Sequence, residues 1–90
     1  MINIVKIYTT WCTPCKMLSP ILEKLQTEFK EQIHIEEVNA DNGVPELYSG
    51  MNIMSTPTLL FLKEGILLEK VSGLKTYDEL KELINKLLKE

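Results

Sequence analysis

The 90-residue chain has no arginine, one histidine and only two cysteines, and each shortage narrows what the protein can be. All ten cations are lysines and the net charge is −3, unlike the basic surfaces that bind nucleic acid. No apolar run approaches the ~18 residues that a membrane span needs. We therefore expect neither nucleic acid nor a membrane as a partner.

The start of the chain and its cysteine usage predict where the protein works. The N-terminus enters an apolar strand pattern almost at once, which leaves no room for a secretory signal. Two cysteines at catalytic spacing suit a reducing compartment. The sequence therefore predicts a cytoplasmic protein. With 44% hydrophobic and 26% charged residues, we expect one globular domain over residues 1–90.

The two cysteines lie in the segment Trp11–Lys16, between an apolar run and a helical pattern. A Cys-x-x-Cys pair at a helix start can close into a disulfide and reopen with little backbone movement. Unpaired backbone N–H groups and the helix dipole favour the thiolate of Cys12, and the thiolate is the nucleophile in disulfide exchange. The placement predicts redox chemistry, with Cys12 attacking and Cys15 resolving.

Two other interpretations of the cysteines compete with redox chemistry. A structural disulfide would more often join distant segments, because closing so short a loop removes little entropy from the unfolded chain. A zinc site needs four ligands, and the only other soft ligand is His34, which we expect at an exposed strand position. We therefore predict no metal site.

Hydrophobic periodicity, turn residues and capping residues predict seven elements in the order β-α-β-α-β-β-α, an α/β domain. These are a strand Ile2–Tyr8, a helix from Thr13 to about Lys30, a strand Ile33–Ala40, a short helix Val44–Met51, a hairpin of Thr58–Leu62 and Ile66–Val71, and a last helix capped by Thr76.

Several motifs together resemble the thioredoxin family over nearly the whole chain. Trp11–Met17 followed by Pro20–Leu22 is similar to the family's active site and first helix, Ser55–Leu59 to its cis-proline loop, Lys63–Gly65 to its hairpin, and Ser72–Gly73 to its groove glycine. The resemblance implies a four-stranded mixed sheet between helices, with strand order two-one-three-four and a cis Thr56–Pro57 bond. Typical members begin with an extra strand and helix that this chain lacks, so we expect a minimal version.

The resemblance also implies a function, the reduction of protein disulfides by the Cys12/Cys15 dithiol. No cofactor would be bound, and electrons would come from NADPH through a thioredoxin reductase. The partners would be disulfide-containing proteins and that reductase, and we expect a monomer. The implied substrate groove consists of Trp11, Thr13, Pro14, Thr56, Pro57 and Gly73.

The sequence departs from the family in the charge expected beneath the active site. Where typical thioredoxins carry a buried Asp, this chain has Lys6, and Glu37 aligns with the family's partner lysine. Because an unpaired buried charge costs several kcal/mol, we predict a reversed Lys6–Glu37 ion pair that serves proton transfer at Cys15. Alternatively, the missing first helix leaves Lys6 in water and Glu37 on the surface.

Two further functions stay open at the level of the sequence. A glutaredoxin-like, glutathione-coupled reductase fits the short length, although Thr56 and Ser72–Leu74 do not match the glutathione site of glutaredoxins. A thioredoxin-like binding subunit would barely use its thiols. Thr13 and Pro14 put no histidine or extra positive charge beside Cys12, so we expect a reducing potential nearer about −270 mV than about −120 mV.

Overall fold

The computed structural model describes all 90 residues and contains four strands, two α-helices and two short 3₁₀ helices. In chain order these are β1 (Ile2–Tyr8), α1 (Thr13–Phe29), η1 (Lys30–Gln32), β2 (Ile33–Asn39), η2 (Glu46–Met51), β3 (Thr58–Lys63), β4 (Ile66–Ser72) and α2 (Tyr77–Leu88).

The sheet has the strand order β2-β1-β3-β4, as predicted. β1 pairs in parallel with β2 and antiparallel with β3, and β3 pairs antiparallel with β4. In this register Lys6 lies opposite Glu37 on one side and opposite Leu59 on the other. The central position of β1 explains why its sequence is almost wholly apolar.

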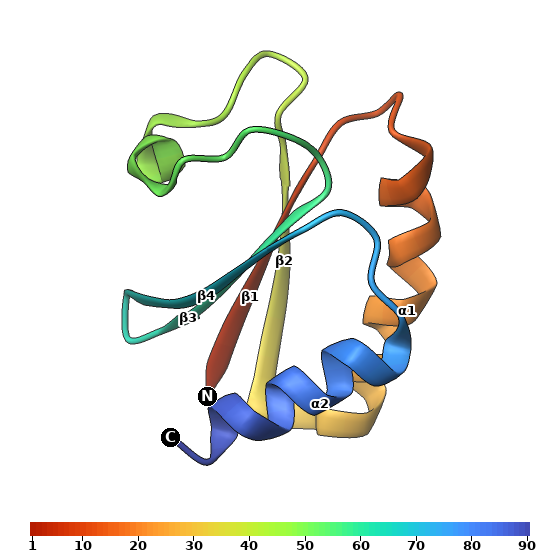
Figure 1. Ribbon diagram of the computed structural model, residues 1–90, viewed down its shortest axis with the longest axis vertical. Coiled ribbons are helices and arrows are strands. Elements are labelled where there is room, and N and C mark those ends of the chain that lie inside the picture. The colour runs from red at the N-terminus through yellow and green to blue at the C-terminus, as the bar shows by residue number, and fades with distance from the viewer.

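Both α-helices pack on one face of the sheet, where they enclose the main core (Figure 1). The apolar residues of α1 recur at helical spacing, as predicted, and Leu18, Leu22, Leu25 and Phe29 are buried in this core. Met17, which the same spacing placed in the stripe, is instead 54% exposed. The core consists of Ile2, Ile4, Leu18, Leu22, Leu25, Phe29, Ile33, Leu59, Phe61, Leu80, Ile84 and Leu87.

The opposite face of the sheet has a smaller core beneath η2. Its buried residues are Val5, Ile7, Ala40, Tyr48, Leu60 and Leu62. The predicted short helix Val44–Met51 is a 3₁₀ helix that starts only at Glu46, after Pro45. Six residues that include Gly50 are too few and too flexible to meet the cost of starting an α-helix. The sheet therefore does lie between helices, but only a 3₁₀ helix covers its second face.

The turns and caps follow the sequence signals closely. Glu64 and Gly65, between β3 and β4, both have positive φ (52° and 79°), as a two-residue hairpin turn demands. Thr76 Oγ1 accepts from the N–H of Glu79 at 3.1 Å, and Glu79 Oε1 accepts from the N–H of Thr76 at 2.9 Å. This predicted capping box fixes the start of α2.

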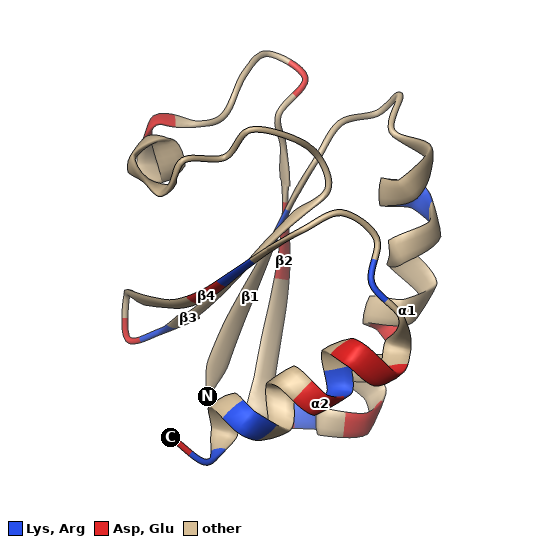
Figure 2. Ribbon diagram, viewed as in Figure 1, with Lys and Arg blue, Asp and Glu red and all other residues tan.

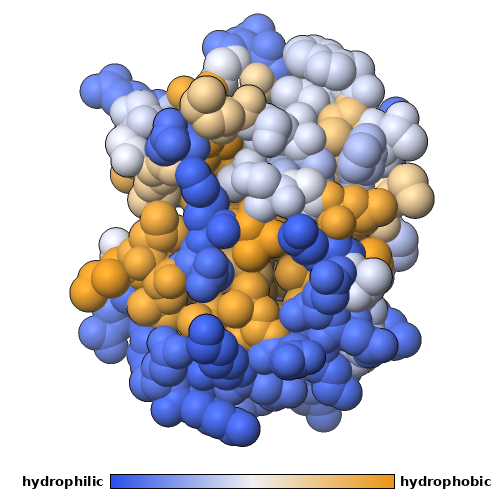
Figure 3. Space-filling model, in the orientation of Figure 1, coloured by the Kyte–Doolittle hydropathy of each residue, from blue (hydrophilic) through white to orange (hydrophobic).

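Charge is distributed unevenly over the molecule. Figure 2 shows acidic and basic residues alternating along α2, whereas the loops at the opposite end of the sheet carry few charges. Apolar side chains cover part of the surface near the β3–β4 hairpin (Figure 3), where Ile66 and Leu67 are exposed. Neither α-helix is long and apolar enough to cross a lipid bilayer.

Candidate active site

Cys12 and Cys15 form a disulfide at the N-terminus of α1. Cys12 is the residue that caps the helix, and its Sγ accepts a hydrogen bond from the N–H of Cys15 at 3.1 Å. Pro14 lies in the first turn, where its missing N–H leaves no gap in the helix ladder. The Cα atoms of the two cysteines are 5.2 Å apart, so one helical turn holds both sulfurs together.

The two cysteines differ in access to solvent. The exposed fraction is 8% for Cys12 and 1% for Cys15. Trp11, directly before Cys12, is 70% exposed, so it is not a core aromatic. Thr13 and Pro14 are also exposed. Cys12 is therefore the more accessible of the two cysteines, and it has exposed residues on both sides in the sequence.

The loop before β3 lies against the disulfide end of β1. The Thr56–Pro57 peptide bond is cis, as predicted. The hydroxyls of Thr56 and Thr9 share a hydrogen bond of 3.1 Å, which joins this loop to the segment that leads into the cysteines. The N–H of Gly73 donates to the carbonyl of Pro57 at 2.8 Å, and Gly73 has a φ of +87°. The predicted groove residues thus come from three segments held to one another.

Lys70 of β4 supports the same loop from the second face of the sheet. Its Nζ donates to the carbonyls of Met51 and Asn52, at 3.3 and 2.8 Å. Asn52 has a φ of 54° and ends η2 just before the Pro57 loop. Met51 packs against the smaller core, whereas Met54 is 84% exposed.

Asp41 joins the loop after β2 to the loop after β1. Its two carboxylate oxygens accept from the N–H and the hydroxyl of Thr10, both at 2.8 Å. The hydrogen bond from the Thr10 N–H lowers the pKa of Asp41, because it stabilises the carboxylate. The sequence did not predict this contact, although the ends of parallel neighbouring strands must meet at one edge of the sheet.

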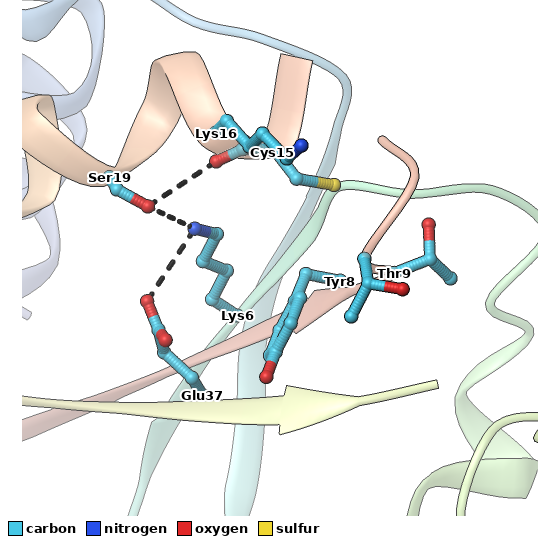
Figure 4. Close-up of a pocket in the computed structure, with 8 residues that line it drawn as sticks. Lys6, Tyr8, Thr9, Cys15, Lys16, Ser19 and Glu37 are labelled. Carbon is cyan, nitrogen blue, oxygen red and sulfur yellow. Dashed lines mark hydrogen bonds and ion pairs between the residues drawn. The ribbon is translucent and has the colours of Figure 1, made fainter. Parts of the chain in front are cut away.

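Lys6 and Glu37 form the predicted ion pair, with Nζ and Oε2 3.5 Å apart. The Nζ of Lys6 also donates to Ser19 Oγ at 2.7 Å, and Ser19 Oγ donates to the carbonyl of Cys15 at 3.5 Å (Figure 4). Lys6 is 3% exposed, so the alternative of a lysine in water is wrong. Glu37 is 52% exposed, so the pair is only half buried.

A cavity of about 370 Å³ opens between α1 and the end of β1. Lys6, Ser19 and Glu37 line it, and so does Cys15. Cys15, which is only 1% exposed, therefore borders a cavity that also holds the charged pair. Ser19 could not be predicted from the sequence, because nothing in its spacing distinguishes it from an ordinary polar residue of α1.

The other residues considered from the sequence lie away from this arrangement. His34 is exposed on β2, as expected. No three side chains of His, Cys, Asp or Glu lie close enough together to hold a metal ion. The chemistry that the geometry supports is thiol-disulfide exchange at Cys12 and Cys15.

Comparison with known proteins identifies relatives that share this arrangement. The family model for Thioredoxin matches residues 1–86. Thioredoxin from Listeria monocytogenes is 40% identical over 79 residues, which cover 88% of this chain and 76% of that protein. Thioredoxin from Bacillus subtilis is 39% identical over 79 residues, covering 88% and 75%.

A solved structure, that of a mutant thioredoxin from Halobacterium salinarum, has the same fold. It superposes with a TM-score of 0.82 at 30% identity and covers 94% of this chain and 73% of its own.

Proposed function

The chain belongs to the thioredoxin family and is a thiol-disulfide oxidoreductase, and from that premise we propose that it works as a reductase of protein disulfides. The observation that carries this direction is the environment of Cys12. Its sulfur caps a helix, Cys12 is more exposed than Cys15 (8% against 1%), and neither a histidine nor a lysine lies between the two cysteines. The thiolate is therefore stabilised enough to attack but not so strongly that the reduced form is favoured over the disulfide.

The proposed reaction has two exchange steps. The thiolate of Cys12 attacks a substrate disulfide, a mixed disulfide forms, and one substrate sulfur leaves as a thiolate that takes up a proton. Cys15 then loses its proton and attacks the sulfur of Cys12. The mixed disulfide breaks, the Cys12–Cys15 disulfide forms, and the second substrate sulfur leaves. Two electrons have passed from the dithiol to the substrate.

The substrate segment would bind across Trp11, Thr13, Pro14, Thr56, Pro57 and Gly73. Exposed Trp11 offers an apolar surface beside the nucleophile, and the cis-proline loop offers backbone groups that can pair with an extended chain. The hydrogen bonds of Thr9 with Thr56 and of Gly73 with Pro57 hold these groups in place before substrate arrives. A prearranged groove reduces the ordering cost of binding.

Lys6 and Glu37 would assist the second step. Glu37 is the carboxylate of the cavity that Cys15 lines, and we assign to it the proton that Cys15 loses. Because Glu37 is half exposed, it can pass that proton on to solvent.

Thiol-disulfide exchange needs no bound cofactor. Each turnover leaves the Cys12–Cys15 disulfide, which must be reduced before the next one. We propose a thioredoxin reductase that draws electrons from NADPH, disulfide-containing proteins as substrates, and a cytoplasmic monomer acting between them. The proposed domain is the whole chain, residues 1–90.

Reduction of insulin disulfides tests the function directly. Turnover is measured with NADPH and a bacterial thioredoxin reductase, and in parallel with glutathione, NADPH and glutathione reductase. We expect turnover in the first mixture only, and none with the Cys12→Ser variant in either. Turnover only with glutathione would replace the proposal with a glutaredoxin-like activity. Failure in both mixtures and also with dithiothreitol would leave a binding subunit.

A further inference from the structure

Lys6 is the most unusual buried side chain of the molecule, because it carries a charge at a position that the strand pattern would fill with an apolar residue. It is 3% exposed and points to the helix-covered face, on the same side of β1 as Ile2 and Ile4. A buried ammonium is costly unless its surroundings stabilise it. The groups around its Nζ must therefore stabilise this positive charge.

Three groups around the Nζ of Lys6 stabilise a positive charge. Ser19 Oγ accepts its hydrogen bond at 2.7 Å, the carboxylate of Glu37 lies at 3.5 Å, and the ring of Tyr8 has its centroid 5.6 Å away (Figure 4). The shortest of these contacts is to a neutral hydroxyl. The carboxylate is both farther away and 52% exposed.

The unequal burial of the pair leaves a net positive field in the cavity. Water screens the half-exposed carboxylate of Glu37 more than the ammonium of Lys6. The other charged group lining the cavity is Lys16 of α1, which is exposed. Asp41, on the loop after β2, is held by both its oxygens on Thr10.

Cys15 lines the same cavity, and its ionisation after reduction of the disulfide is the property that this charge would change. Cys15 lines the cavity with Lys6, and Ser19 joins the two residues by accepting from Lys6 and donating to the carbonyl of Cys15. Burial disfavours a thiolate, whereas a nearby cation favours it. We propose that Lys6 is a positioning residue whose ammonium stabilises the thiolate of Cys15 when it resolves the mixed disulfide, with Glu37 keeping that ammonium in place.

This role rests on the proposed function and adds a sign to it. In the resolving step Cys15 gives up its proton, its sulfur pair forms the bond to Cys12, and the substrate sulfur leaves with the other pair. A cation beside Cys15 raises the fraction ready to attack, whereas a carboxylate alone would lower it. The two residues of the pair thus have different roles: Lys6 stabilises the thiolate of Cys15, and Glu37 accepts its proton.

Opposite charge changes test the sign. In the Cys12→Ser background Cys15 is the only thiol, and its ionisation is followed by thiolate absorbance across pH. We expect Lys6→Gln to move the midpoint up by about one pH unit, a tenfold loss of thiolate at neutral pH. Glu37→Gln should move it down, because the cation is then unopposed. Lys6→Arg should restore most of the original midpoint.

A matched control removes the same charge from the same cavity wall. Lys16→Gln takes away an exposed lysine next to Cys15 in sequence, and we expect a shift at most a third of that from Lys6→Gln. Equal shifts from Lys6→Gln and Lys16→Gln would show a long-range effect and overturn the proposal. Shifts of one sign from Lys6→Gln and Glu37→Gln would overturn it too, since lost packing and not charge would then be responsible.

A kinetic measurement separates this inference from the function beneath it. Stopped-flow tryptophan fluorescence with a disulfide peptide resolves the attack by Cys12 from the resolution by Cys15. In Lys6→Gln we expect unchanged attack and about tenfold slower resolution at pH 7. If the resolution step has the same rate in the wild type and in Lys6→Gln, the role of Lys6 is wrong but the proposed function stands. If Cys12 does not attack the peptide in either the wild type or Lys6→Gln, the proposed function itself is wrong. If Lys6→Gln fails to fold, Glu37→Gln alone decides, and an upward or absent shift of the midpoint overturns the proposal.

Discussion

The two ends of the helix-facing side of β1 differ in polarity. Ile2 and Ile4 are 1% and 0% exposed and lie in the main core, whereas Lys6 and Tyr8 lead into the cavity that reaches Cys15. The same strand, the same face and the same covering helix thus enclose an apolar half and a polar half. The apolar half belongs to the main core, and the polar half borders a cavity that Cys15 also lines.

The largest loss of activity is expected from replacing the cysteines themselves. Cys12→Ser should abolish disulfide reduction, because the nucleophile is lost, and Cys15→Ser should stop the reaction at the mixed disulfide. Mass spectrometry after mixing with a disulfide substrate checks both. A trapped adduct is expected with Cys15→Ser only. An adduct with Cys12→Ser would assign the two roles the other way round.

A core truncation tests the apolar half. Ile4→Ala should lower the free energy of unfolding by about 2–5 kcal/mol, because it leaves a cavity in a fully buried site. Urea denaturation measures this change. Turnover per folded molecule should stay near that of the wild type, and a tenfold loss under conditions where the variant is folded would show that the halves are not separate.

Lys6 lies two residues after Ile4 on the same face of β1, and Lys6→Met should lower the free energy of unfolding far less than Ile4→Ala does. We expect the free energy of unfolding to stay within about 1 kcal/mol of the wild type, since an apolar chain replaces a buried ammonium and half-exposed Glu37 can hydrate. The same urea titration checks this. A loss as large as that of Ile4→Ala would mean that the polar half holds the fold as firmly as the apolar half.

A smaller effect is expected at the helix that covers the apolar half. Thr76→Ala removes the side-chain acceptor of the Glu79 N–H at the start of α2. The expected cost is about 1 kcal/mol, typical for loss of a helix cap. Thr76→Ser keeps the acceptor and serves as the matched control. Equal losses in both variants would show that the hydroxyl does not act as a cap.

The smallest effect is a pH dependence at the disulfide end. The Thr10 N–H lowers the pKa of Asp41 in the folded state, so this carboxylate adds stability above its unfolded pKa, and that stability is lost as pH falls through the lower folded value. Wild type and Asp41→Asn should therefore differ in melting temperature near pH 7 and converge in acid. A difference that persists unchanged at the lowest pH would contradict this assignment.

Much of the fold could be predicted because local signals specify it. The apolar stripe of α1, the Glu64–Gly65 turn and the Thr76 cap each depend on residues close together in the sequence, and they form as expected except that Met17 of the stripe is exposed. The strand order and the cis Thr56–Pro57 bond followed from the resemblance. The short helix was assigned the wrong type, because apolar spacing over a few residues does not distinguish an α-helix from a 3₁₀ helix.

The candidate site was less predictable where it depends on contacts between distant segments. The cysteines and the Lys6–Glu37 pair could be found, the pair by a change of residue type at a known position. Ser19, the Thr9–Thr56 bond and the Thr10–Asp41 bond could not, because single polar residues have no periodicity. The unequal burial of Lys6 and Glu37 depends on how α1 covers the sheet, which only the three-dimensional arrangement reveals.

The central claim is that the polar half of this face serves a reducing dithiol, and the redox potential tests it most directly. The Cys12–Cys15 disulfide is equilibrated against glutathione buffers of known potential, and Trp11, the only tryptophan, reports the reduced fraction by fluorescence. We predict a midpoint near or below about −250 mV, as for a thioredoxin-type reductase. A midpoint above about −200 mV would contradict the account and indicate a glutathione-coupled or oxidising role.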